Sequence, residues 1–247
     1  MVRCALLLVV LAACPAGGDD DYPIIVGGGG GGPSNPSNPD ASGGGGVDAP
    51  DGTIFGRVCR LTELRRLLGA RASDCLLPLA DSTLVKLGAT EVAPDRLDGT
   101  FAMPAQSGEN LAWTVTGGVY MTSVIPAAGA WPVLPVIDTA TYTERQSRHG
   151  ILAGPQHGGL VVRVLKGNVP VSGATAKIDN GESAQTFYDS DDDLMWGETS
   201  TGALGLAWLP DNMAGSRVLI VSKPPSSVMT EVVLVAEQLT FVTVSLP

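Results

Sequence analysis

The length of the apolar runs is the feature that most limits how this chain can fold. Beyond residue 53, short runs rich in Val, Leu, Thr and Phe recur between Gly, Pro, Asn and Asp. Runs of this kind are typical of strands and turns in all-β domains. A membrane-spanning helix needs about 20 consecutive apolar residues, which no run approaches. The pattern therefore predicts an all-β fold and excludes a polytopic membrane protein.

Two blocks of the chain, residues 54–138 and 159–247, repeat one order of elements. Each has a strand, a strand led by Gly or Pro, a turn into an alternating strand that ends in Pro, and a further strand. Large residues alternate around Trp113 and Trp208, so both are expected to face a core. Residues 140–148 lack Gly and Pro, which predicts a helix within an interdomain segment over 139–158. The last two strands, 228–235 and 239–246, are predicted to form a hairpin.

The two blocks share motifs with a known family. In the second block these are Pro170, Gly173-Ala174, Thr201-Gly202 and Pro210; in the first they are Gly56, Val58, Asp98-Gly99, Phe101 and Pro104. This pattern resembles the carboxypeptidase regulatory-like family, a transthyretin-like Greek-key β-sandwich. The resemblance implies two tandem sandwich domains without catalytic activity, serving as spacing or interaction modules. A generic immunoglobulin-like sandwich is the alternative fold.

The N-terminus has the layout of a secretory signal: Arg3, an apolar run and small residues before Cys14. Residues 11–14, Leu-Ala-Ala-Cys, resemble the lipobox of bacterial lipoproteins, which implies that residues 1–13 are removed and that Cys14 carries acyl chains. Two or three chains anchor a protein to a membrane essentially permanently. Pro15 would follow the lipidated residue, and by analogy with Gram-negative sorting this favours the outer membrane. An ordinary signal peptide, or a buried strand, with a chance cysteine is the alternative.

Residues 14–53 are dominated by Gly and Pro and contain nothing that fills a core. Such a composition is typical of a flexible, disordered tether that connects the anchor to the folded part. The remaining cysteines, Cys59 and Cys75, are expected to form a disulfide because an exported protein folds in an oxidising compartment. Two buried thiols are the alternative.

An acidic run, residues 189–193, is the sharpest polar feature. The carboxylates of Asp189, Asp191 and Asp193 repel one another, and a Ca²⁺ ion with oxygen ligands would relieve this repulsion. The run lacks the Gly and the Glu that a calcium-binding loop of the EF-hand type requires. A solvated acidic hairpin is the alternative, and no other cofactor is expected.

Trp131 and Trp196 are candidates for exposed aromatic residues, because one lies between Gly and Pro and the other beside the acidic run. Exposed tryptophans beside Asp and Asn stack on sugar rings in carbohydrate-binding sandwiches. The pair therefore raises a glycan-binding hypothesis, with a packing role as the alternative.

No catalytic motif accompanies these features. The two histidines, His149 and His157, are expected in an exposed linker, and a zinc site would need more ligands than accompany them. A formal charge of −10 argues against binding to nucleic acid. We therefore predict a non-catalytic lipoprotein of the outer membrane, either periplasmic or surface-exposed, that has a structural role or interacts with an envelope protein. Carbohydrate binding is the alternative, and a role as accessory to an envelope enzyme is the third.

Overall fold

Strands make up most of the folded chain, as the short apolar runs predict. The computed structural model describes residues 52–64, 75–106, 111–127, 132–179, 185–190, 196–197 and 199–247, all of which belong to one compact unit. The predictions for the signal peptide, Cys14 and the tether up to residue 51 lie outside the described residues. So do those for Trp131, Asp191 and Asp193.

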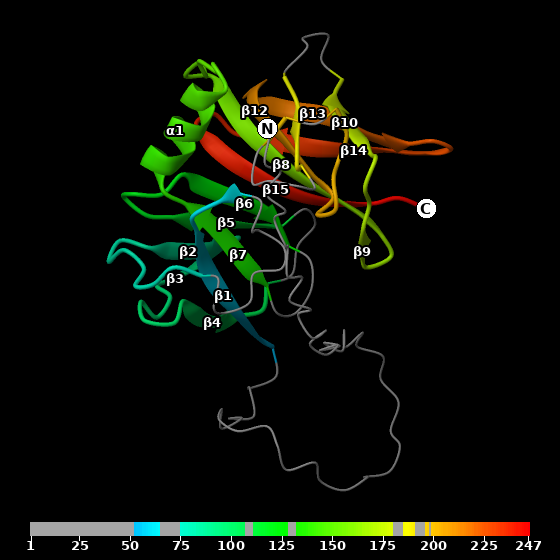
Figure 1. Cartoon of the computed structure of the whole chain (residues 1–247). Helices are drawn as coiled ribbons and strands as arrows, with labels where there is room; N and C mark the ends of the chain where they lie inside the picture. Colours follow the sequence, from blue (N-terminus) through cyan, green and yellow to red (C-terminus); the bar gives the residue numbers. More distant parts are fainter. Residues whose placement is uncertain are drawn as a thin grey trace, which may run out of the picture. The chain divides into compact units, whose positions relative to one another are not determined.

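One large sheet runs through this unit (Figure 1). Its strands are β2 (Leu84–Leu87), β3 (Thr90–Val92), β5 (Ala112–Thr116), β6 (Thr122–Pro126), β8 (His157–Lys166), β9 (Val169–Pro170), β11 (Phe187–Tyr188), β12 (Leu206–Met213) and β15 (Gln238–Ser245). Their order is β11-β12-β8-β15-β6-β5-β2-β3, and β9 pairs with β8 beside this path. The sheet therefore contains strands from both halves of the chain.

Two small sheets pack against the two ends of the large one. The first has the order β4 (Thr100–Pro104), β1 (Thr53–Leu61), β7 (Val133–Ile137), and the second β10 (Thr175–Ile178), β13 (Gly215–Lys223), β14 (Ser226–Leu234). Val58 of β1 and Leu134 of β7 share a buried cluster with Val115 of β5. Leu219 of β13 shares another with Val162 of β8. Two sandwiches result, one from each half of the chain.

A third buried cluster lies on the other face of the large sheet, at the end where this sheet forms the second sandwich. Val161 of β8, Trp208 of β12 and Phe241 of β15 point away from the cluster just described, because side chains alternate along a strand. The single helix of the described residues, α1 (Thr139–Arg148), and the segment around Cys59 cover them. This end of the large sheet is therefore buried on both faces.

The C-terminal strand connects the two sandwiches. β15 lies between β8 and β6 and is parallel to both, with Leu239 opposite Gly159 on one side and Ser123 on the other. We predicted two domains joined by a hinge over 139–158. The structure instead has two sandwiches that share one continuous sheet, and residues 139–148 are the predicted helix, packed on that sheet.

The predicted hairpin of the last two strands does not form. β14 pairs with β13, whereas β15 belongs to the large sheet, so residues 235–237 pass from one sheet to the other. Burial explains this connection: Val232 and Leu234 of β14 pack on Val244 of β15 across the sandwich. The run of two apolar strands was recognised correctly, but its pairing depends on contacts far apart in the sequence.

Candidate functional site

Cys59 and Cys75 form the predicted disulfide, with an S–S distance of 2.04 Å. The disulfide ties β1 to Cys75, and the next residue, Leu76, forms a β-bridge with Arg60. Arg60 in turn donates to the carboxylate of Asp138, the residue that precedes α1, through hydrogen bonds of 3.1, 3.3 and 2.6 Å. The hydrogen bond with Asp138 raises the pKa of Arg60. This disulfide segment, by which we mean the described residues 59–64 and 75–76, is thus linked to the start of the helix.

Glu63 links the same segment to α1 through an ion pair with Arg145. Its side chain is 5% exposed, and its carboxylate lies 2.5 Å from the Arg145 guanidinium. The other carboxylate oxygen accepts a hydrogen bond of 3.3 Å from the indole N–H of Trp196. Burial of a carboxylate is costly unless it is paired and hydrogen-bonded, and here it is both. The ion pair holds the disulfide segment, α1 and the segment at Trp196 together.

Trp196 is buried, with 4% of its surface exposed, in contrast to the prediction of an exposed sugar-binding residue. Its ring centroid lies 5.7 Å from that of Trp208, inside the third cluster. A sugar ring cannot stack on this face, because protein already covers it. The packing alternative holds for Trp196.

Asp189 is fully buried, and its carboxylate binds the backbone. Its oxygens accept hydrogen bonds from the N–H groups of Gly202, Leu204 and Leu206, at 3.0, 2.8 and 2.7 Å. Three backbone donors thus satisfy the two oxygens of this buried carboxylate. The role visible for Asp189 is therefore to fix the turn into β12. Within the described residues, no group of three or more His, Cys, Asp or Glu side chains is placed to hold a metal ion.

Helix α1 docks on an irregular point of β12. The pairing of β12 with β8 shifts register between Leu209 and Asn212, and this bulge leaves the Pro210 carbonyl free to accept hydrogen bonds. The Tyr142 hydroxyl donates to it at 3.4 Å, and the Gln146 amide donates at 3.3 Å. Residues four apart share one face of a helix, so the two side chains act together. Burial raises the pKa of Tyr142, and the Trp208 indole opposes this effect.

Two glycines let the helix and a turn approach β8 closely. A Cβ atom at Gly159 would lie 2.2 Å from the Tyr142 hydroxyl, and one at Gly158 would lie 2.3 Å from the Val235 carbonyl oxygen. Both distances are far below van der Waals contact. The Tyr142 ring and the Val235 backbone already occupy the space that a larger side chain would need. The pair Gly158-Gly159 is therefore required for packing at this point.

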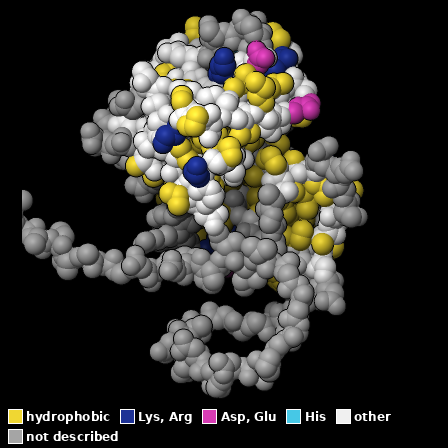
Figure 2. Space-filling model, turned by 90° about the vertical axis from the view of Figure 1, so that its right-hand side faces the viewer, with side chains coloured by type: hydrophobic (Ala, Val, Ile, Leu, Met, Phe, Trp, Pro, Cys, Tyr) yellow, Lys and Arg dark blue, Asp and Glu magenta, His cyan; other side chains and the backbone are white. Residues whose placement is uncertain are grey.

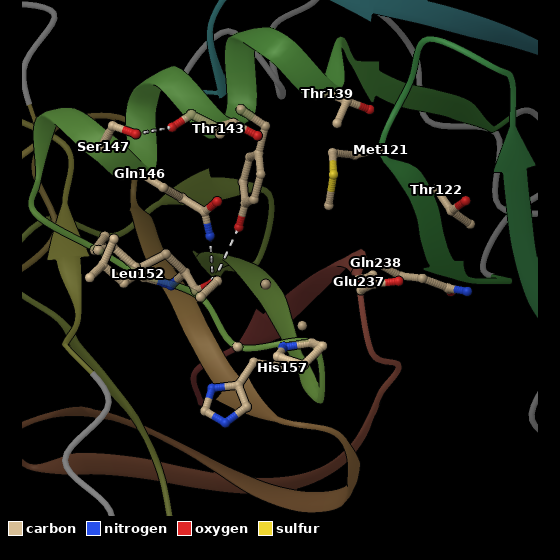
Figure 3. A pocket seen from close by; sticks show the side chains of 18 of the residues that line it. Met121, Thr122, Thr139, Thr143, Gln146, Ser147, Leu152, His157, Glu237 and Gln238 are labelled. Carbon is tan, nitrogen blue, oxygen red and sulfur yellow. Dashed lines mark hydrogen bonds between the residues drawn. The ribbon is translucent and has the colours of Figure 1, made fainter.

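A cavity of about 670 Å³ opens beside these contacts. Figure 3 shows α1 along one wall, with Thr139, Thr143 and Ser147 on it, while Thr122 begins β6 and Met121 precedes it. The remaining walls are residues 151–155, His157 at the start of β8, and the turn at Glu237 and Gln238. The cavity thus lies where the two sandwiches meet, and its walls come from four separate parts of the chain.

Two residues, His157 and Glu237, stand out in the lining of the cavity. His157 Nδ1 lies 2.5 Å from an oxygen of Asp211, so the imidazole has a fixed orientation rather than the exposed linker position we predicted. Glu237 has a φ of 58°, a left-handed conformation that is uncommon outside glycine and asparagine. Its backbone N–H donates to the His157 carbonyl at 2.8 Å, which holds the turn against β8.

The second histidine belongs to the aromatic cluster. The His149 ring lies 4.5 Å from Phe187 and 5.7 Å from Trp208, measured between ring centroids. Burial lowers the pKa of His149, the Arg145 charge lowers it further, and Glu63 opposes both. His149 therefore packs as an uncharged ring, which corrects the prediction of an exposed linker residue.

Sequence reasoning missed the cavity, because its lining residues are single Thr, Ser and Gln side chains that form no motif. The signal closest to it was the Gly158-Gly159 pair beside His157, which lies at the base of the cavity. Of the described helices, none is long and apolar enough to cross a membrane. No family model matches this chain, and no curated protein is significantly similar to it.

Proposed function

We propose that this protein is a non-catalytic lipoprotein of the outer membrane that binds another envelope protein through strand β14. The lipobox-like residues 11–14 and the disulfide between Cys59 and Cys75 support an exported protein, because disulfides persist in oxidising compartments. The resemblance to carboxypeptidase regulatory-like domains supports a role as an interaction module.

The free edge of β14 is the observation on which the binding function rests. β14 is nine residues long and ends the order β10-β13-β14, so in the described part of the chain no strand pairs with its outer edge. At about 3.3 Å per residue, this edge measures about 30 Å. Sheet proteins normally protect such edges with charges, proline or short strands, and β14 carries a single charged residue, Glu231.

The outer face of the same sheet carries exposed apolar side chains among polar ones. Met229 and Val233 of β14 are 70% and 59% exposed, and Met229 lies opposite Ile220 of β13. Figure 2 shows one face of the molecule, on which hydrophobic side chains gather between a few charged ones. Extended segments add to a free strand through backbone hydrogen bonds, while side-chain contacts give specificity. The partner we propose is therefore an extended segment with alternating apolar residues.

Crosslinking in intact cells tests this function. A photo-crosslinking amino acid at Met229 is expected to capture one defined envelope protein, whereas the same group at exposed Lys86, in the other sandwich, is expected to capture none. Met229→Arg is expected to abolish capture from an adjacent probe at Val233. Capture of a second copy of this chain at Met229, or equal labelling from both positions, would contradict the proposal.

The anchor has its own test. Labelling of cells with a palmitate analogue is expected to mark the protein, and Cys14→Ala is expected to abolish the label and release the protein from the membrane. A Cys4→Ala variant serves as the matched control, because Cys4 lies within the segment expected to be removed. Retention of the label in the Cys14→Ala variant would refute the lipidation.

A further inference from the structure

The cavity at the junction of the two sandwiches has the dimensions of a small-molecule site. Its volume, about 670 Å³, falls within the range of about 300–1,000 Å³ that is typical of ligand pockets. Pockets of this kind often lie between structural units, as this one does. It is separate from the edge of β14, so a ligand here would be additional to the protein partner.

Neutral polar side chains make up much of the lining. Thr122, Thr139, Thr143, Ser147 and Gln238 supply hydroxyl and amide groups, each of which both donates and accepts hydrogen bonds. No Lys or Arg is among the lining residues, so a phosphate or carboxylate would meet no cationic side chain there. The lining thus favours an uncharged ligand rich in hydroxyl groups.

Apolar surface lies beside these groups. Met121, Ile151 and Leu152 line the same cavity, and Leu152 is 92% exposed. An exposed leucine in the wall of a cavity gains from being covered by C–H surface. A sugar ring presents both kinds of surface, because its hydroxyls lie around its rim and its C–H groups lie on its faces.

Glu237 supplies the one carboxylate of the lining. Its left-handed backbone is strained, and glycine would adopt the same conformation without strain. The turn keeps a glutamate there nonetheless, and residues held in such conformations concentrate at binding and active sites. A carboxylate accepts two hydrogen bonds from neighbouring hydroxyls, and these are stronger than bonds to a neutral acceptor.

We propose that this cavity binds a neutral mono- or disaccharide, with Glu237 accepting hydrogen bonds from adjacent sugar hydroxyls. Helix α1 supplies Thr143 and Thr139 from the other wall, as Figure 3 shows. The same carboxylate repels acidic sugars, so the site discriminates between neutral sugars and uronates.

Saturation-transfer NMR and calorimetry on the full chain in detergent test the proposal. The probes are cellobiose, N-acetylglucosamine and glucuronate. We expect at least one of the two neutral sugars to bind at least tenfold more tightly than glucuronate. Absence of binding by both neutral sugars, or tighter binding of glucuronate, would overturn the proposal.

Two variants and a control locate the site. Glu237→Gly is expected to raise the melting temperature, because it relieves the strained backbone, and to weaken sugar binding at least tenfold. Thr143→Val keeps the shape of the side chain and is expected to weaken binding about threefold. Thr175→Val, on the exposed surface of β10, is the control and is expected to change nothing. Unchanged affinity in the Glu237→Gly variant would place the sugar elsewhere and refute the site.

Discussion

The two ends of the large sheet bury their strands in different ways. In the first sandwich, β2 and β5 alternate between buried and more exposed residues, because only one face of the sheet is covered. In the second, β8 is buried without interruption from Gly158 to Val162, and β12 from Leu206 to Pro210. Strands covered on both faces need continuous apolar runs, whereas strands covered on one face need only alternation.

This difference shows what α1 contributes. Its sequence has three threonines and little intrinsic preference for a helix, so packing must stabilise it. Tyr142 and Gln146 provide that packing against β12. The second sandwich thus gains a third layer, built from α1 and the disulfide segment, and the described residues add no such layer to the first sandwich.

The largest expected effect tests whether the two ends are one folding unit. Deletion of residues 238–247 removes β15, which lies between β8 and β6 and contributes to two buried clusters. A domain is stable by only about 5–15 kcal/mol, so we expect the loss of all cooperative unfolding, measured by circular dichroism on heating. A chain that lacks only Pro247 is the control. If a cooperative transition from the first sandwich survived, the two ends would be independent domains.

The sequence predicted most individual strands, because their residues alternate or run continuously between turn residues. Trp113 and Trp208 face cores as expected, at 1% and 0% exposure. β7 was missed since Pro135 interrupts it; proline is tolerated there because β7 lies at the edge of its sheet. Local pattern therefore identified strands but not an edge strand that contains a proline.

The order of the strands in the sheets and the presence of the cavity could not be predicted from the sequence. Nothing in residues 238–245 specifies that they pair with β6, more than 100 residues earlier in the chain, since this pairing depends on which apolar faces remain uncovered. Trp196 was misjudged for the same reason: its acidic neighbours suggested exposure, but Glu63 and Trp208 bury it. Contacts between distant segments therefore decided both the strand pairing and the burial of Trp196.

The two tryptophans provide the second test. Trp208 contacts four other rings, those of Tyr142, His149, Phe187 and Trp196. Among the described residues, Trp113 contacts the ring of Phe101. Replacement of a buried aromatic residue by alanine costs about 3–5 kcal/mol. We expect Trp208→Ala to cost about 5 kcal/mol and Trp113→Ala about 3 kcal/mol.

Urea denaturation measures both costs. Trp208→Phe and Trp113→Phe are matched controls that keep an aromatic ring at each site, and each is expected to cost less than its alanine variant. Equal costs for the two alanine variants would mean that the third layer adds nothing to the stability of the second sandwich.

The disulfide belongs to the third layer, and its removal is expected to have the next largest effect on stability. Cys59 and Cys75 are 16 residues apart, and closing a loop of this size in the unfolded chain contributes about 3 kcal/mol. The double substitution Cys59→Ala, Cys75→Ala is expected to lower the free energy of unfolding by about that amount, measured in urea. Reductant should destabilise the native protein similarly and leave the double variant unchanged. A response of the double variant to reductant would assign the effect to something other than this bond.

The smallest expected effect is on the pH dependence of stability. It concerns only the second sandwich, because His149 packs on the aromatic cluster of that sandwich. Burial holds the pKa of folded His149 below its ordinary value of 6.5, so the unfolded chain takes up a proton first as the pH falls. Stability from this residue is therefore complete above pH 6.5 and declines as the pH falls from there toward the folded pKa.

His149→Phe keeps the ring against Phe187 and cannot titrate, so we expect its melting temperature to fall less than that of the native protein between pH 7 and pH 5. His157→Gln removes the other imidazole and serves as the control. If the native protein and the His149→Phe variant lost stability in parallel over this range, the packed ring would not be the group that responds to acid.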